Sequence, residues 1–326
     1  MLKKWKNIIT ALLASVLMSI LLTGCGEDNA VKEKFVHIAT GGTAGTYYPI
    51  GGAIGEILNK NISQMHASIQ STGGSVSNIY LLSEGDVELA IVQNDIAHYA
   101  TNGTEMFKDA NKHKFENLKG IASLYPEACQ FVTLADKGIN SIADLKGKKV
   151  AVGAEGSGAE ANARQILESY GITYNDIDAQ YLSFAAGAKA LKESSVDVAF
   201  LTAGYPTAAV QDIASNHKIK ILSLDDEHIK AVSEKYPFYT KTMIPKDTYN
   251  GLDEDVQTVS VMAILICNSD RVDEELGYQI TKSIFTNLDT LKTAHNAIAN
   301  LDAKTATEAM SVDMQKGADK FFKESK

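Results

Sequence analysis

Two glycine-rich segments contain the residues of this sequence best suited to hold a small ligand. They are ATGGTAGTYYP at residues 39–49 and GAEGSGAE at residues 153–160. Each lies between a strand-like apolar run and a helical run. Glycine lets the backbone turn sharply and approach a ligand closely, and the first N–H groups of a helix have no partner inside it. Both segments therefore offer backbone donors at the start of a helix.

Backbone donors at helix starts favour an anion. The N-terminus of a helix carries roughly half a positive charge, which stabilises a facing anion by about 0.3–2 kcal/mol. Thr46 and Ser157 are candidates to cap the two helices. Two such starts, one from each half of the chain, predict that a small anionic solute, such as a carboxylate, binds between them. The alternative is that these glycines only make tight turns between strand and helix.

Arginine is too scarce to dominate such a site. The chain has two arginines, Arg164 and Arg271. Arg164 lies about two turns inside its predicted helix, and Arg271 follows a predicted strand, so neither is expected to face a ligand. Backbone amides and hydroxyls would then supply most of the donors.

Further candidates stand at other strand ends and helix starts, where open α/β sheets bind their ligands. Ser75 begins a predicted helix, although a capping role alone would explain it. Gln93 ends a strand, and Glu127 could accept a hydrogen bond from an ammonium or hydroxyl group. The complete predicted ligand-binding set is Thr43, Gly45, Thr46, Tyr47, Tyr48, Ser75, Gln93, Tyr125, Glu127, Gly156, Ser157, Gly158, Ala159, Ala203 and Gly204.

No pattern in the sequence indicates catalysis, a metal or a cofactor. The seven histidines are scattered singly, and neither an HExxH nor a Walker-type phosphate loop occurs. The glycine-rich segments do not meet the dinucleotide-binding fingerprint. Catalysis would need a nucleophile–base pair, a metal set or a covalent cofactor site. We therefore expect a binding protein without a metal or cofactor.

The N-terminus resembles a lipoprotein signal. Lys3, Lys4 and Lys6 precede an apolar run over residues 8–22, which is shorter than the roughly 20 residues that a membrane span needs. The run ends in LTGC, a lipobox-like tetrad in which Cys25 would carry the lipid. We expect a signal peptide at 1–24, a tether at 25–34 and attachment to the outer face of the cell membrane through acyl chains. An uncleaved anchor or an ordinary signal peptide is the alternative.

Composition narrows the class of protein. Residues 1–24 contain three lysines and no acid, so the formal charge of −9 becomes −12 once they are removed. An acidic surface argues against nucleic-acid partners and against a polybasic membrane patch. The remaining 302 residues exceed what one core usually serves, so two lobes are expected. We also expect the protein to be a monomer.

The other two cysteines are predicted to be structural. Cys129 and Cys267 lie in apolar strand-like runs, without the spacing of a metal site. Buried free thiols are the expectation, and a bridge between them in an oxidising compartment is the alternative.

Strand-like and helical runs alternate along the chain, which indicates an α/β sheet. A segment over residues 139–153 resembles a crossover into a second lobe, and a long apolar strand at 256–267 would return the chain to the first. Residues 102–117 are polar and are predicted to form a surface excursion. Strands are predicted at 35–40, 66–71, 88–92, 120–125, 130–135, 148–152, 177–181, 196–201, 219–224 and 256–267, and helices at 48–59, 159–169, 184–193 and 314–322, after residues 206 and 273, and from residue 75.

We therefore predict an α/β fold with two mixed-sheet lobes joined by hinge strands. Lobe 1 is assigned to residues 35–130 and 260–326, and lobe 2 to residues 131–259.

Several of these segments together resemble the TAXI family, the extracytoplasmic receptors of one class of TRAP transporter. They are IATGGTAGTYYPIGG at 38–52, GAEGSG at 153–158, NARQIL at 162–167, YPFY at 236–239 and residues 254–259. The resemblance covers about residues 35–325. It implies a bilobal α/β fold of the periplasmic-binding-protein type (type II) and TRAP membrane components as partners. It also implies uptake driven by an ion gradient and a ligand similar to glutamate, glutamine or 2-oxoglutarate. The alternatives are a receptor of an ATP-driven uptake system, or an enzyme or sensory protein on the same scaffold.

Overall fold

The structure of the protein is a computed structural model that describes residues 33–111 and 115–325. The chain divides into an N-terminal segment, residues 1–34, and a compact unit, residues 35–326. The predicted signal peptide, Cys25 and nearly all of the tether lie outside the described residues. Among the described residues, no helix combines the length and the apolar character that crossing a membrane requires.

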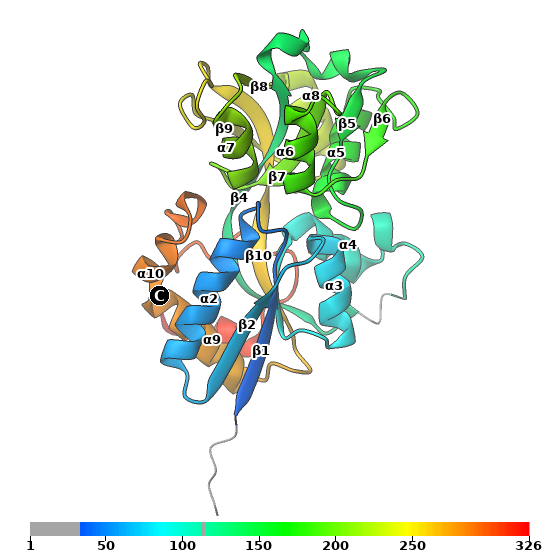
Figure 1. Ribbon diagram of the computed structural model, residues 1–326. Coiled ribbons are helices and arrows are strands. Elements are labelled where there is room, and N and C mark those ends of the chain that lie inside the picture. Colours follow the sequence, from blue (N-terminus) through cyan, green and yellow to red (C-terminus); the bar gives the residue numbers. More distant parts are fainter. Residues whose placement is uncertain (1–32, 112–114, 326) are drawn as a thin grey trace, which may run out of the picture. The chain divides into compact units, whose positions relative to one another are not determined.

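The compact unit is built on one mixed sheet (Figure 1). Its main path runs β2-β1-β3-β10-β4-β7-β5-β6, while β8 pairs with β4 and β9 with β10. The strands are β1 (Lys34–Ala39), β2 (Met65–Gln70), β3 (Leu89–Gln93), β4 (Leu118–Leu134), β5 (Lys149–Ala151), β6 (Asp178–Gln180), β7 (Val198–Ala203), β8 (Ile219–Ile221), β9 (Thr240–Ile244) and β10 (Val256–Asn268).

Two long strands, β4 and β10, are shared by both lobes. They pair antiparallel along most of their length, from Ser260 opposite Ala128 to Asn268 opposite Leu118. In one lobe β10 also pairs with β3, which is parallel to β1; in the other, β4 pairs with β7, which is parallel to β5. The predicted two-lobe mixed α/β fold is confirmed. The exact lobe boundaries remain a proposal, because both strands run through without a break.

The two strands predicted at 120–125 and 130–135 are in fact one, and that prediction was wrong. Pro126 between them has no N–H to donate, which made the pattern look interrupted. In the structure Pro126 lies where only β10 pairs with β4, since pairing with β7 begins at Ala128. A proline is tolerated at such an edge position.

Helices flank the sheet in both lobes (Figure 1). They are α2 (Tyr47–Asn61), α3 (Ser75–Glu84), α4 (Asn94–Asn102), α5 (Gly158–Ser169), α6 (Phe184–Lys192), α7 (Ala208–Ala214), α8 (Asp226–Lys235), α9 (Glu274–Thr286), α10 (Leu288–Lys292) and α11 (Lys316–Glu324). Short 3-10 turns lie at Glu105–Phe107, Ala135–Lys137, Ile142–Leu145 and Asn296–Ile298.

The segment predicted as a surface excursion is partly core. Phe107 and Phe115 are completely buried, and both rings pack against Tyr80 of α3 at centroid distances of 5.6 and 5.7 Å. Two isolated aromatic residues in a polar stretch do not form a helical or strand-like apolar repeat, so no sequence pattern indicated that they are buried. Helices α4 and α8 and strand β9 were likewise not predicted.

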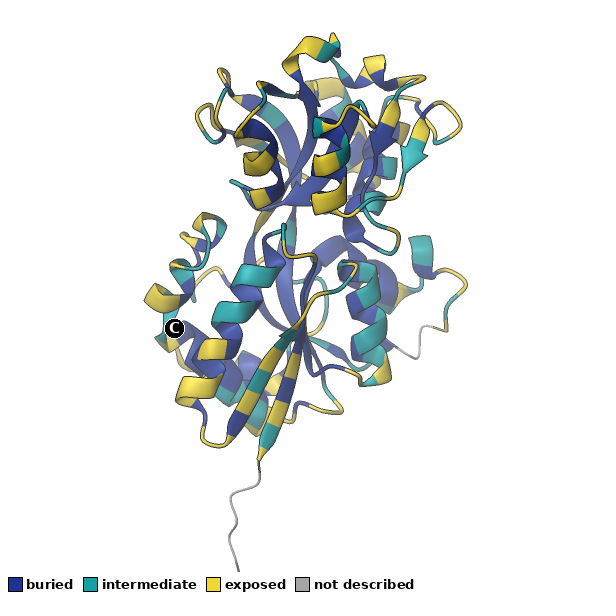
Figure 2. Ribbon diagram, viewed as in Figure 1, coloured by how far each residue is buried: buried dark blue, intermediate teal, exposed yellow. Residues whose placement is uncertain are grey.

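Buried apolar residues form clusters on both sides of the sheet (Figure 2). One cluster is continuous between the lobes, because it joins Val92 and Ile96 of the first lobe to Ile166 and Phe200 of the second. Cys129 is buried within it, while Cys267 is buried in another cluster, and both thiols are free.

The crossing of α9 and α11 is a sensitive point of the fold. A Cβ on Gly317 would lie 2.0 Å from the Glu274 carbonyl oxygen and 2.4 Å from the Tyr278 nitrogen, both backbone atoms. In contrast, a Cβ on Gly52 of α2 would meet only Ile69 Cδ1, at an ordinary 3.7 Å.

We therefore predict opposite effects for two glycine-to-alanine variants. Gly317→Ala should lower the free energy of unfolding by about 1–3 kcal/mol, because α9 and α11 must move apart. Gly52→Ala should raise it by up to about 1 kcal/mol, since alanine is the better helix former. Urea unfolding followed by circular dichroism measures both. Equal stability of Gly317→Ala and the unmodified protein would contradict the close crossing.

Candidate functional site

A cavity of about 340 Å³ lies where the two lobes meet. This volume is at the lower end of the roughly 300–1,000 Å³ typical of small-molecule sites. Its walls consist mainly of loops and helix starts that follow strands of the shared sheet. The lining residues are 41–47, 71–75, 93, 127, 154, 157–159, 183–185 and 202–203.

Four helices begin at this cavity, two from each lobe. Tyr47 and Ser75 are the first residues of α2 and α3, and Gly158 and Phe184 are the first residues of α5 and α6. The sequence predicted the starts of α2 and α5 on either side of a ligand, and the structure places both in the cavity wall. The starts of α3 and α6 double the number of helix ends there.

Capping differs between the lobes. Ser157 accepts a hydrogen bond from the Glu160 N–H (3.1 Å), as predicted, and Ser183 accepts one from Ala186 (3.3 Å). Thr46 does not cap α2, contrary to the prediction, because its hydroxyl donates to the Gly204 carbonyl of the other lobe (3.1 Å). Ser75 is not a cap either, since its Oγ accepts from the Gln93 N–H (3.1 Å).

The turn before α5 requires glycine at two positions. Gly153 has a φ of 109°, and a Cβ there would lie 2.9 Å from the Glu160 nitrogen. At Gly158 a Cβ would lie only 1.8 Å from Oε1 of Gln93 on the other lobe. The absence of a side chain at Gly158 lets α5 start directly against Gln93.

The lining residues include no lysine, arginine or histidine, and one carboxyl group, that of Glu127. Glu127 is buried and accepts a hydrogen bond from the Tyr47 hydroxyl (2.8 Å). Burial raises the pKa of Glu127 well above its ordinary value, and the nearby Asp95 adds to this, while the Tyr47 hydrogen bond acts against it. The raised pKa favours the uncharged form of Glu127, which opposes the positive potential of the helix starts less than a carboxylate would.

The two arginines lie away from the cavity lining. Arg164 pairs with Glu105 (3.4 Å) and with two glutamates on its own helix, and Arg271 pairs with Glu88 (2.9 Å).

Eleven of the fifteen predicted ligand-binding residues line the cavity. They are Thr43, Gly45, Thr46, Tyr47, Ser75, Gln93, Glu127, Ser157, Gly158, Ala159 and Ala203.

The other four predicted residues lie outside it. Tyr48 follows Tyr47 on α2, and consecutive helical residues face different directions. Tyr125 lines a separate cavity of about 590 Å³ together with Tyr205 and Pro206. Gly156 and Gly204 bridge the lobes instead: the Gly156 carbonyl accepts from the Ser77 N–H (3.1 Å), and the Gly204 carbonyl accepts from Thr46.

Several lining residues were not predicted. Ser183, Phe184 and Ala185 form the start of α6, and Ser71 and Thr202 end or follow strands. A serine directly before an apolar helical run is a capping signal, so Ser183 could have been found. Ser71 and Thr202 stand at strand ends, the signal that located Gln93 and Ala203, but only the folded sheet shows that these two residues reach the cavity.

A buried hydrogen-bond network joins the lobes beside the cavity. Gln93 Nε2 donates to Asn162 Oδ1 (3.0 Å), and Asn162 Nδ2 donates to Asp95 Oδ2 (2.9 Å) and to the Tyr239 hydroxyl (2.8 Å). The Tyr239 hydroxyl donates to Gln165 Oε1 (2.7 Å).

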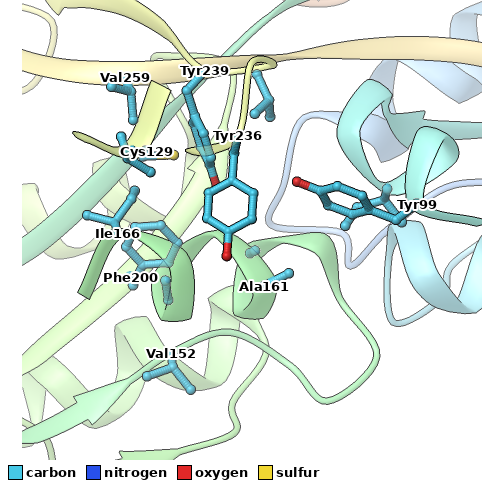
Figure 3. Packing of buried hydrophobic residues seen from close by; sticks show 14 of the residues in the cluster. Tyr99, Cys129, Val152, Ala161, Ile166, Phe200, Tyr236, Tyr239 and Val259 are labelled. Atoms are coloured by element: carbon cyan, nitrogen blue, oxygen red, sulfur yellow. The ribbon is translucent and has the colours of Figure 1, made fainter. Parts of the chain in front are cut away.

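An aromatic contact extends this junction. Tyr99 of α4 in the first lobe packs edge-on against Phe238 of the second lobe, with ring centroids 5.9 Å apart. Figure 3 shows the Tyr99 hydroxyl directed toward Tyr236. Gln165 Nε2 donates to the Tyr99 hydroxyl (3.4 Å). The described lobes are therefore held in contact by polar as well as apolar groups.

The chain matches a known protein family over most of its length. The sequence pattern of the NMT1-like family matches residues 38–325. Among solved structures, PhnD1 of Prochlorococcus marinus in complex with methylphosphonate is 14% identical, with 82% of this chain and 90% of that chain covered and a TM-score of 0.52.

Two further solved structures match a similar share of this chain. A protein of Bordetella bronchiseptica RB50 is 17% identical over 87% of this chain and 84% of that chain, with a TM-score of 0.51. The periplasmic aliphatic sulphonate binding protein SsuA of Escherichia coli is 12% identical over 90% and 84%, with a TM-score of 0.45. The similarity to PhnD1 and to the Bordetella bronchiseptica protein is a similarity of fold.

Asp95, in the buried hydrogen-bond network between the lobes, makes the stability of the protein depend on pH. Burial raises the pKa of Asp95 from 3.8 to about 7, although hydrogen bonds from the Ile96 N–H and Asn162 lower it. Between pH 3.8 and about 7, the Asp95 carboxyl of the folded protein keeps a proton that the unfolded chain has lost. The stability of the folded protein therefore falls as the pH rises through this range.

We predict that Asp95→Asn flattens this dependence. The free energy of unfolding of the unmodified protein should decrease by on the order of 4 kcal/mol more than that of Asp95→Asn between pH 4 and 7. Urea titrations at several pH values measure the two slopes. Parallel slopes would show that the Asp95 carboxyl is not held in the buried environment described.

Proposed function

Because this chain belongs to the NMT1-like family, we propose that it is an extracytoplasmic solute receptor that delivers a small anionic solute to a membrane transporter. The observation that carries the proposal is the cavity between the lobes, in which four helix starts converge without a cationic side chain among the lining residues. In this proposal the protein binds and releases its solute and does not convert it.

The ligand is proposed to be a small carboxylate, such as glutamate, glutamine or 2-oxoglutarate. Free N–H groups at helix starts suit an anionic group, and a cavity of about 340 Å³ suits a small one. Hydroxyl groups of Thr43, Ser75 and Ser183 line the same space and can bind further polar atoms. Because PhnD1 shares the fold and carries methylphosphonate, phosphonates belong among the compounds to be tested.

The membrane partner is proposed to be a TAXI-type TRAP permease, which is driven by an ion gradient. Support comes from the sequence segments at 38–52 and 153–158, of which seven and three residues respectively line the cavity. An ATP-driven importer is the alternative partner. We further propose that a lipid on Cys25 holds the receptor, as a monomer, at the outer face of the cell membrane.

A charge placed in the first turn of α5 tests the anion site. Ala159 is buried in the cavity wall at the second residue of that helix. An aspartate there is favourable for the helix but occupies the region proposed for the anion, whereas asparagine has nearly the same size and no charge.

We predict that Ala159→Asp binds carboxylates about a hundredfold more weakly than Ala159→Asn, because two like charges would lie a few ångströms apart. Calorimetry with L-glutamate, L-glutamine, 2-oxoglutarate and methylphosphonate measures the affinities, and circular dichroism checks that both variants fold. Equal affinities of the two variants for a compound that the unmodified protein binds would contradict an anion at this helix start.

The energy source of uptake distinguishes the two partners. Mass spectrometry of the solute that co-purifies with the native protein supplies the compound. Proteoliposomes with the cognate permease should then accumulate that compound when an ion gradient is imposed without ATP. Uptake that needs ATP and ignores the gradient would instead identify the ATP-driven alternative.

A further inference from the structure

The side chain of Gln93 leaves one polar atom without a partner inside the protein. Gln93 ends β3, is 2% exposed and lines the cavity. Its Nε2 donates to Asn162, but its Oε1 accepts no hydrogen bond from any residue that the structure describes. Buried acceptors are nearly always paired, so an unpaired acceptor on a residue that lines the cavity points to a donor that arrives with a ligand.

The orientation of this amide is set from the other lobe. Asn162 uses its Nδ2 to donate to Asp95 and Tyr239, so that its Oδ1 is directed at Gln93. Because Asn162 Oδ1 can only accept, it binds the Nε2 end of Gln93. The Gln93 oxygen is thereby placed beside the first residue of α5, where only a glycine leaves room for it.

On the premise of the receptor function above, we propose that Gln93 is a specificity-determining residue. Its Oε1 accepts a hydrogen bond from an O–H or N–H group of the solute, and Asn162 is the residue that positions it. The solute is therefore a carboxylate that also carries a hydrogen-bond donor, and the corresponding compound without the donor binds more weakly.

Selection of this kind takes place when the lobes close. Gln93 ends a strand of the first lobe and Asn162 belongs to α5 of the second, so their hydrogen bond exists only while the lobes are in contact. A solute without the donor leaves Oε1 unpaired in the closed form alone. Since a ligand stabilises closure only by binding the closed form more tightly, such a solute closes the protein less effectively.

The test is a ratio of dissociation constants for matched compounds. L-glutamate and L-2-hydroxyglutarate each differ from glutarate by one donor group. For the unmodified protein we expect glutarate to bind at least about tenfold more weakly than either, which is the usual effect of one hydrogen bond to a buried acceptor. In Gln93→Met, which keeps the size and removes the acceptor, the ratio should fall towards one.

Asn162→Leu tests the positioning role and does not alter Gln93 itself. It should lower the same ratio, because the Gln93 amide loses its fixed orientation. Glu105→Gln is the matched control: it weakens the Arg164–Glu105 pair, which also joins the lobes but lies outside the cavity lining. This control should change the affinity for all three compounds by the same factor and leave the ratio intact.

The outcomes separate a failure of the proposed Gln93 role from a failure of the proposed ligand class. An unchanged ratio in Gln93→Met, or a ratio near one in the unmodified protein, overturns the role of Gln93 while the receptor function stands. If the unmodified protein binds none of the three dicarboxylates, the proposed ligand class fails, and the inference falls with its premise. A reduced ratio in both Gln93→Met and Asn162→Leu, with the ratio intact in Glu105→Gln, supports the proposal.

Discussion

A cavity without a cationic side chain in its walls must bind an anion through neutral donors, chiefly backbone N–H groups and hydroxyls. This constraint explains why the site is built from helix starts, whose first N–H groups have no partner within the helix. It also explains the glycines, since a backbone can approach a ligand closely only where no side chain intervenes. Four helices meet this requirement together, because the shared sheet directs the carboxyl ends of strands from both lobes toward one space.

Buried carboxyl groups oppose this arrangement less than exposed ones would, because burial favours their protonated forms. The pKa of Glu127 is raised well above its ordinary value by burial, and that of Asp95 is raised to about 7. Tyr47 donates a hydrogen bond to Glu127 and Asn162 donates one to Asp95, which partly offsets the free energy lost when these carboxyl groups are buried. The cavity thus contains hydrogen-bonding groups of both kinds, while the helix starts provide its main electrostatic potential.

Closure and recognition depend on the same contacts. The lobes share β4 and β10, so they can separate by bending these strands without breaking the sheet that runs through both. Opening would break the Thr46–Gly204, Ser77–Gly156 and Gln93–Asn162 hydrogen bonds at or beside the cavity. It would also break the Asn162–Asp95, Gln165–Tyr99 and Arg164–Glu105 contacts and divide the apolar cluster that both lobes share. A solute that strengthens any of them in the closed form shifts the protein toward that form.

The sequence by itself determined the α/β class, the two lobes and most of the helix starts, because glycine turns, caps and apolar periods are local signals. It did not reveal that residues 118–134 form one strand, since Pro126 interrupts a pattern that only the pairing with β10 restores. It also placed Tyr125 and Tyr48 in the site, although neither lines the cavity. The tertiary structure alone decided which strand ends and helix starts meet, and it alone turned Asn162 of one lobe against Gln93 of the other. Such contacts join residues about 70 positions apart, and no local property of either residue records its partner.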